Sequence, residues 1–326
     1  MSNSIGDHTG SLEARPSGDN AVRRITEGLD LLVEEMHPLG NVVQAFRELL
    51  VERARFKAEL EGCQVSSLRA APDPLRFERG VPLASIESLI DSIDDTLWAE
   101  ATERLMPVMV GSFPKIGKEL EIIQRSLSQG SLDPRALLKA YVMGNEGRNT
   151  AVASRLEVNP QTLAFAVGQV AKPLIERIAS HLSPLVEGLF WGKGYCPLCG
   201  TMPELAFLQG EGQRWLRCAS CSHEWRFTLL ICPFCESENH DDFEIYFVAG
   251  REYENVDVCH KCRRYVPTID QRKWPKPIAR EVAAIALMHL DVIAQEKGFL
   301  PAAVCAWNIV RDRDTFSMPV RITASQ

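Results

Sequence analysis

Four Cys-x-x-Cys pairs, crowded into one part of the chain, constrain this sequence more than any other feature. Eight of its ten cysteines lie in the 67 residues from Cys196 to Cys262. A Cys-x-x-Cys turn points two thiolates at one cation, and a hairpin brings a second pair opposite it to complete a tetrahedron. The sequence therefore predicts two four-thiolate metal sites, each built on a small ribbon of strands.

The order of the pairs indicates how they combine. Sequential pairing leaves 18 residues between the pairs of the first set and 23 between those of the second, which is typical of metal ribbons. A cross-braced arrangement, first pair with third and second with fourth, is the alternative. We expect two metal ions per chain. The predicted ligands are Cys196, Cys199, Cys218 and Cys221 in the first site and Cys232, Cys235, Cys259 and Cys262 in the second.

The identity of the metal is open at this point, because tetrahedral sulfur suits both zinc and iron. Composition alone favours zinc, whereas the turn from Cys196 to Gly200 looks like a rubredoxin knuckle. Ser222, Glu236 and Arg263 follow the other pairs, where a glycine would most easily adopt a left-handed turn, so only the first knuckle is expected to be fully of that kind. Four thiolates leave no position for water or substrate, so we expect no hydrolytic centre and no enzyme.

The rest of the chain indicates a cytoplasmic protein without a membrane span. Residues 1–20 are polar, lack the apolar core of a secretory signal, and are expected to form a flexible tail. The longest mostly apolar stretch begins at Val282 and is shorter than the roughly 20 residues that cross a bilayer. In a reducing compartment, clustered cysteines are more often metal ligands or redox groups than disulfides.

An α+β fold follows from a change of pattern along the chain. Residues 21–190 carry apolar side chains at three- and four-residue steps and are expected to form a helical domain. Asp133-Pro134 and Asn159-Pro160 are helix starts, and Pro173 is expected to kink or break the second of these helices. The short alternating runs that follow predict two tandem rubredoxin-like or zinc-ribbon-like modules, then one last helix. Their predicted bounds are 191–230, 231–274 and, for the last helix and tail, 275–326.

Several other residues have a structural interpretation that we prefer. Cys63 and Cys305 are isolated, and a lone cysteine is usually a small buried hydrophobe. His223 and His260 lie beside knuckles, but eight cysteines already complete two sites, so the histidines are expected around the sites or at the surface.

The charge of the metal-binding part argues against nucleic acid as a partner. Residues 261–276 group several basic and aromatic side chains, which suits either a partner patch or a solvated ribbon face. Residues 191–274 contain ten Lys or Arg and twelve Asp or Glu, a net charge of −2. Two tetrathiolate sites with divalent ions bring this to about −6, because each site adds about −2. Affinity for a polyanion needs the opposite sign.

Five segments together resemble the formate dehydrogenase accessory protein family. They are YCPLCGTMPELA, LRCASCSHEWRF, ICPFC, CHKCRRYVPTID and ALMHLDVIAQEKGF, and the match runs from Tyr195 to Phe299. The resemblance implies a helical N-terminal domain, two rubredoxin-like ribbons with the eight paired cysteines as functional residues, and iron in preference to zinc.

The resemblance also implies a role. A member of this family is a cytoplasmic protein required for active respiratory formate dehydrogenase, and it binds the catalytic subunit during cofactor loading, before export. Two alternatives from other classes remain: a rubredoxin-like carrier of single electrons, and a zinc-ribbon protein that binds nucleic acid. The sequence does not predict an oligomeric state.

Overall fold

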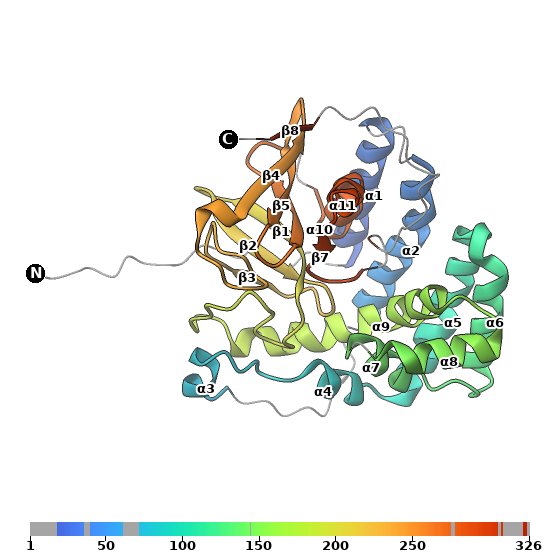
Figure 1. The fold of residues 1–326 in the computed structure, drawn as a ribbon. Coiled ribbons are helices and arrows are strands. Elements are labelled where there is room, and N and C mark those ends of the chain that lie inside the picture. Colours follow the sequence, from blue (N-terminus) through green and yellow to red (C-terminus); the bar gives the residue numbers. More distant parts are fainter. Residues whose placement is uncertain are drawn as a thin grey trace, which may run out of the picture.

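The computed structural model describes residues 18–35, 40–60, 72–143, 145–274, 278–305, 308 and 322–324. Its N-terminal half is helical and its C-terminal half is built on a sheet, as the sequence predicts (Figure 1). The helices of the first half are α1 (Gly18–Glu35), α2 (Gly40–Glu59), α3 (Pro74–Glu78), α4 (Ile86–Asp91), α5 (Asp95–Ser112), α6 (Gly117–Ser128), α7 (Pro134–Val142), α8 (Glu146–Leu156) and α9 (Pro160–Leu182). Of the predicted tail, residues 1–17 lie outside the described residues, as does Cys63.

Two of these helices begin as expected. The Asp133 carboxylate accepts the backbone N–H groups of the first turn of α7, and Pro134 occupies the position whose N–H would have no partner. Asn159 and Pro160 start α9 in the same way, with Asn159 Oδ1 2.7 Å from the Gln161 nitrogen. Both starts are therefore determined by local sequence.

Pro173 does not break α9, which continues as one helix from Pro160 to Leu182. The expectation of a break at this position is wrong. Lys172, Pro173 and Leu174 are all buried, because α2, α5, α7 and α8 pack around α9. The packing of the residues on either side of Pro173 stabilises the helix by more than the missing backbone hydrogen bond destabilises it.

One mixed sheet supports both sets of cysteines, with Cys218 and Cys259 at strand ends and the other six in turns. Its strands are β1 (Pro203–Gln209), β2 (Gln213–Cys218), β3 (Glu224–Arg226), β4 (Phe243–Val248), β5 (Arg251–Cys259), β6 (Arg264–Asp270), β7 (Leu300–Pro301) and β8 (Ile322–Ala324). The order is β3-β2-β1-β6-β5-β4-β8, with β7 paired to β6. Strands β1 to β3 belong to the first cysteine set and β4 to β6 to the second. The parallel pairing of β1 with β6, Phe207 opposite Ile269, joins the two modules side by side.

The predicted last helix is two helices, α10 (Arg280–Ala286) and α11 (Met288–Glu296). Leu287 separates them, and Nδ1 of His289 lies 3.0 Å from the Ala286 carbonyl oxygen. The break lets the two halves pack on different partners: α11 lies against β5 and β6, and α10 lies against α1. The approach of α10 is close, since a Cβ on Gly28 of α1 would meet Val282 at 3.3 Å.

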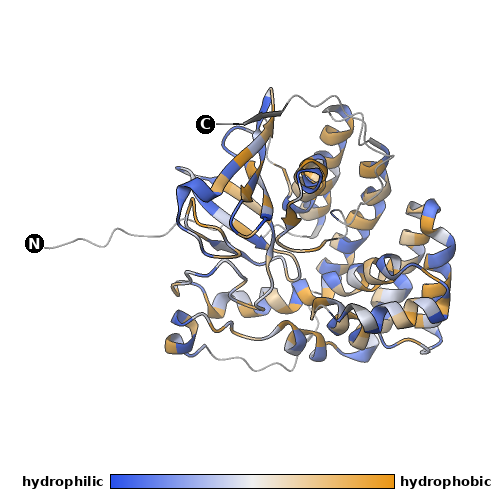
Figure 2. Ribbon diagram, viewed as in Figure 1, coloured by the Kyte–Doolittle hydropathy of each residue, from blue (hydrophilic) through white to orange (hydrophobic). Residues whose placement is uncertain are grey.

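The apolar core runs without interruption from the helices into the sheet. Leu29 of α1, Leu174 of α9, Phe207 of β1 and Ile285 of α10 all belong to one buried cluster. Figure 2 shows apolar and polar residues alternating around the helices and along the strands, in keeping with one inward side for each element. The boundaries between the predicted domains remain a prediction. Within the described residues, none of the helices combines the length and apolar character that a bilayer crossing requires.

Candidate metal centres

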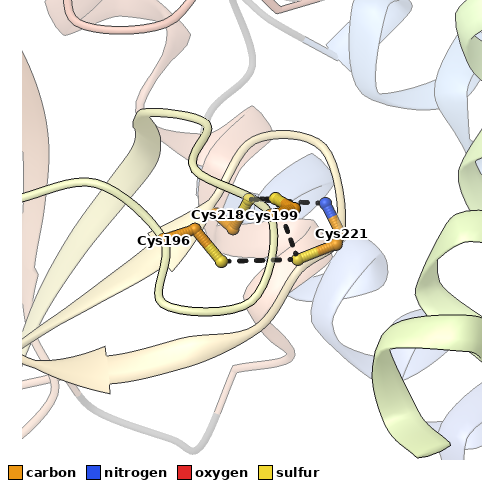
Figure 3. A group of neighbouring side chains, drawn as sticks. All are labelled: Cys196, Cys199, Cys218 and Cys221. Carbon is orange, nitrogen blue, oxygen red and sulfur yellow. Dashed lines mark hydrogen bonds between the residues drawn. The ribbon is translucent and has the colours of Figure 1, made fainter. Parts of the chain in front are cut away.

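The first four cysteines meet between two knuckles, at the end of the β1–β2 hairpin (Figure 3). Sγ of Cys196 lies 3.6 Å from that of Cys221, and Sγ of Cys199 lies 3.5 Å from that of Cys218 and 3.6 Å from that of Cys221. All four residues are free cysteines and are buried. The group comes from the sequential pairs, and its members are too far apart for disulfides, in which the sulfurs are about 2.05 Å apart.

The spacing of the sulfurs fits one tetrahedral ion. Metal–sulfur bonds of about 2.3 Å place the corners of a tetrahedron about 3.8 Å apart, close to the separations of 3.5 and 3.6 Å found here. Burial raises the pKa of the Cys196 and Cys221 thiols well above the ordinary value. A cation at the centre supplies the charge that lets such thiols ionise. The donor set and its spacing therefore suit a divalent or trivalent metal.

The second four cysteines form a similar group between the Cys232–Cys235 turn and the turn that joins β5 to β6. Sγ of Cys232 lies 3.7 Å from that of Cys262, and Sγ of Cys235 lies 3.7 Å from that of Cys259. Cys235 and Cys262 are partly exposed, whereas all four cysteines of the first group are buried. The two candidate sites are thus alike in geometry and different in access to solvent.

All four knuckles adopt the left-handed turn. The residue after each pair has a positive φ: 77° at Gly200, 57° at Ser222, 54° at Glu236 and 58° at Arg263. The expectation that only the first knuckle is of this kind is wrong. In each knuckle that residue donates its backbone N–H to the carbonyl of the first cysteine, at 2.8 to 3.1 Å. The closed turn compensates for the left-handed conformation of a residue other than glycine.

A segment of the N-terminal half clamps the first knuckle. The backbone nitrogens of Leu83 and Ala84 donate to the carbonyls of Pro197 and Leu198, at 2.8 and 2.9 Å. The neighbouring Tyr195 hydroxyl donates to the Gly80 carbonyl at 2.7 Å. The first site is therefore held between the ribbon and the chain that precedes α4.

Helix α9 holds the other knuckle of the first site. Lys172 donates to the Ala219 carbonyl, and the Ser222 hydroxyl donates to Glu176 Oε1 at 2.7 Å. Glu176 also pairs with Arg53 and Lys57 of α2. Burial disfavours the charge of Glu176, but Lys57 and Arg53 hold its pKa well below the ordinary value. An ionised network therefore ties the helices to the metal-binding turn.

Sequence reasoning missed these supporting residues. Lys172 and Glu176 stand four positions apart in the otherwise apolar run VAKPLIE, where two charges indicate buried partners. Thr201, directly after the first knuckle, was missed as well. Its hydroxyl lies 2.8 Å from Sγ of Cys218 and 3.0 Å from Sγ of Cys199.

The remaining residues singled out in the sequence lie outside both groups. His223 Nδ1 is 3.3 Å from the Ser183 hydroxyl, and His260 Nε2 is 3.0 Å from Glu244 Oε2. Cys305 is buried, as predicted for a lone cysteine. In the basic run, Arg272 pairs with Asp270 at 2.7 Å and Arg263 covers the Phe299 ring at 4.1 Å. These contacts stabilise the fold.

Comparison with known proteins gives consistent relatives. No family model matches the chain. The chain is 30% identical over 155 residues to a protein named "Protein FdhE homolog" of Aquifex aeolicus (strain VF5), an alignment covering 46% of this chain and 54% of that protein. A protein of the same name in Haemophilus influenzae (strain PittGG) is 32% identical over 111 residues, 32% of this chain and 35% of that protein. The alignments thus span about half and about a third of these relatives.

The crystal structure of the FdhE protein from Pseudomonas aeruginosa has the same fold. It superposes with a TM-score of 0.60 over 90% of this chain and 97% of that chain, at 21% identity. The structural match extends the likeness into the helical half, which the sequence motifs do not reach. In its paired cysteines and in its fold, the chain is similar to proteins of the FdhE type.

Proposed function

We propose that this protein is an accessory factor for a respiratory formate dehydrogenase: it binds the catalytic subunit during maturation in the cytoplasm, before export, and has no turnover of its own. The resemblance to the formate dehydrogenase accessory family supports this role. So does the closed geometry of both cysteine groups, because four sulfurs around one ion leave no coordination position for a substrate. The eight cysteines then act as ligands of two structural metal ions.

The observation that carries the binding role is an exposed apolar stretch beside the second site. Leu229, Leu230 and Phe234 are 51%, 43% and 37% exposed, and they flank Cys232 in the chain. Apolar side chains gathered at the surface are typical of protein interfaces. Because the second metal orders the turn that carries Phe234, loss of that metal would also disrupt the proposed surface.

A complementation experiment tests this role. A cell that lacks the protein is supplied with the wild type, with Cys232→Ser and Cys235→Ser together, or with Leu229→Ser and Phe234→Ser together. Formate dehydrogenase activity and co-purification of the catalytic subunit are measured. We expect both readouts to fall with either pair of changes and to persist with Met143→Ser, which alters an exposed apolar residue at the end of α7. Full activity from a stably expressed cysteine variant that has lost the second metal would refute the role of that site.

We further propose iron as the metal in the cell, with zinc the alternative, since tetrahedral sulfur accepts both. The family resemblance is the ground for this preference. Elemental analysis of protein purified without oxygen from its own host, together with the visible absorption of ferric thiolates, distinguishes the two. Zinc in both sites under these conditions would contradict the proposal.

A further inference from the structure

An open cavity lies between the helices and the second knuckle of the first site. It has a volume of about 90 Å³, enough for several water molecules. Its walls come from α2, α7 and α9, from the Cys218–Cys221 turn and from the segment after β7. Neither cysteine group uses this space.

One end of the cavity is rich in hydrogen-bond donors. Arg53, Gln169 and Lys172 line it and are each less than a tenth exposed. Arg53 uses two nitrogens, on Gln169 Oε1 at 3.0 Å and on Glu176 Oε1 at 3.4 Å, while its buried Nε has no partner among the described residues. Since the Gln169 oxygen already accepts from Arg53, its amide nitrogen remains as a donor. Both cations of the lining have a carboxylate nearby, since Arg53 pairs with Glu176 and Lys172 Nζ lies 3.8 Å from Glu204 Oε2, so Arg53 Nε and the Gln169 amide are the donors left over.

The other walls are apolar. Leu138, Val142, Phe165 and Ile175 contribute to them. A pocket of this kind, apolar with a few polar groups converging at one end, is the usual form of a small-molecule site. One unpartnered guanidinium nitrogen beside an apolar wall matches a monoanion with an apolar part better than it matches phosphate or a polyanion.

Gly168 has no side chain that would fill the space beside these donors. It lies inside α9 and lines the cavity, and a Cβ added there would meet nothing within 4 Å. Glycine inside a helix loses more conformational entropy on folding than alanine does, and no packing contact in the described structure requires it here.

We propose that this cavity binds a small carboxylate, with the carboxylate on Arg53, Gln169 and Lys172 and the carbon chain against the apolar wall. Ala219 and Ser220, which also line the cavity, lie between two ligands of the first site. Binding therefore depends on the first metal, which orders this wall. The proposal does not rest on the accessory role.

The test is a titration of the zinc-loaded, ¹⁵N-labelled full chain with acetate, propionate and the neutral acetamide at constant ionic strength. The backbone amides of Gly168 and Ala219 are followed by NMR. We expect saturable shifts with acetate, tighter binding of propionate, and at least tenfold weaker binding of acetamide. Equal affinity for acetate and acetamide, or no saturable shift at these two amides, would overturn the proposal.

A blocking variant shows whether the cavity is the site. Gly168→Leu fills the open space without removing a polar contact, and we expect it to weaken acetate binding at least tenfold while the melting temperature does not fall. Gly111→Leu is the matched control, because Gly111 also lies in a helix with nothing within 4 Å of an added Cβ, and it does not line the cavity. Unchanged acetate binding in Gly168→Leu would place the site elsewhere and reject the assignment.

Discussion

The hydroxyl of Ser222, one residue after the last ligand of the first site, donates to the buried carboxylate of Glu176 in α9 at 2.7 Å. This contact joins a metal-binding turn directly to a helix of the N-terminal half. Because Glu176 is also paired with α2, the turn, α9 and α2 share one ion network. Loss of the first metal would therefore affect helices that supply no ligand.

We predict that Ser222→Ala lowers the free energy of unfolding by about 2 kcal/mol, the usual value of a hydrogen bond to a charged group. The left-handed backbone conformation at position 222 is about equally unfavourable for alanine and for serine, so the substitution removes the hydrogen bond alone. Denaturant unfolding of the metal-loaded chain measures it. Ser220→Ala, in the same turn, is the control, and an equal loss there would contradict the role of the Ser222 contact.

Metal analysis should find two ions per chain. Cys199→Ser is expected to retain only the second ion and Cys262→Ser only the first, because the cysteine groups share no sulfur. Elemental analysis after gel filtration provides the measurement. Loss of both ions from either variant would mean that the sites do not load independently.

The second metal is expected to leave before the first when a chelator is added. Cys235 and Cys262 are partly exposed, while the first site is buried and clamped on two sides. Release of metal from the wild type should therefore show a fast and a slow phase of equal size. Cys262→Ser should abolish the fast phase, and a single phase from the wild type would show that exposure does not control release.

Asp291 should make stability depend on pH. Burial raises its pKa to about 7, despite a hydrogen bond from Tyr265 that lowers it. The folded chain then binds this proton more tightly than the unfolded chain does. The contribution of Asp291 to the free energy of unfolding therefore falls as the pH rises from about 4 to 7 and is constant above pH 7. Desolvation lowers the pKa of buried His289 to about 4. The contribution of His289 to the free energy of unfolding therefore rises with pH between about pH 4 and 6.5.

A difference measurement separates these two groups. The free energy of unfolding of Asp291→Asn minus that of the wild type should increase by about 4 kcal/mol between pH 4 and 7, since each pKa unit corresponds to about 1.4 kcal/mol. Unfolding curves at several pH values give this difference. A value independent of pH would mean that Asp291 ionises as easily in the folded chain as in the unfolded one.

Leu230 has φ 59°, a conformation that costs a leucine about 1 kcal/mol, and its side chain is exposed. Leu230→Asn should therefore stabilise the chain by about that amount, since asparagine tolerates the left-handed region. Thermal unfolding measures the gain. Leu229→Asn, at an exposed position without a positive φ, should give none. If the exposed stretch binds a partner, both changes should weaken co-purification.

Local sequence determined much of this protein. The four Cys-x-x-Cys pairs predict two four-sulfur groups, and the Asp-Pro and Asn-Pro starts of α7 and α9 predict two helix ends, because a short turn or cap depends only on neighbouring residues. The spacing of apolar residues along the chain predicts a helical half followed by ribbons of strands. This spacing is also a property of residues that are close in sequence. The spacing also predicts sequential pairing, with a cross-braced arrangement as the alternative, and the structure groups the cysteines sequentially.

Only the tertiary structure decided what joins these parts. The pairing of β1 with β6, the passage of α9 through Pro173 and the break at Leu287 all depend on packing between distant segments, which can outweigh local preference. The left-handed turns at Glu236 and Arg263 arise from closure of the knuckle rather than from the residue type. The bond from Ser222 to Glu176 spans 46 positions in the chain, and no short-range pattern indicates it, because its energy comes from burial that exists only in the folded protein.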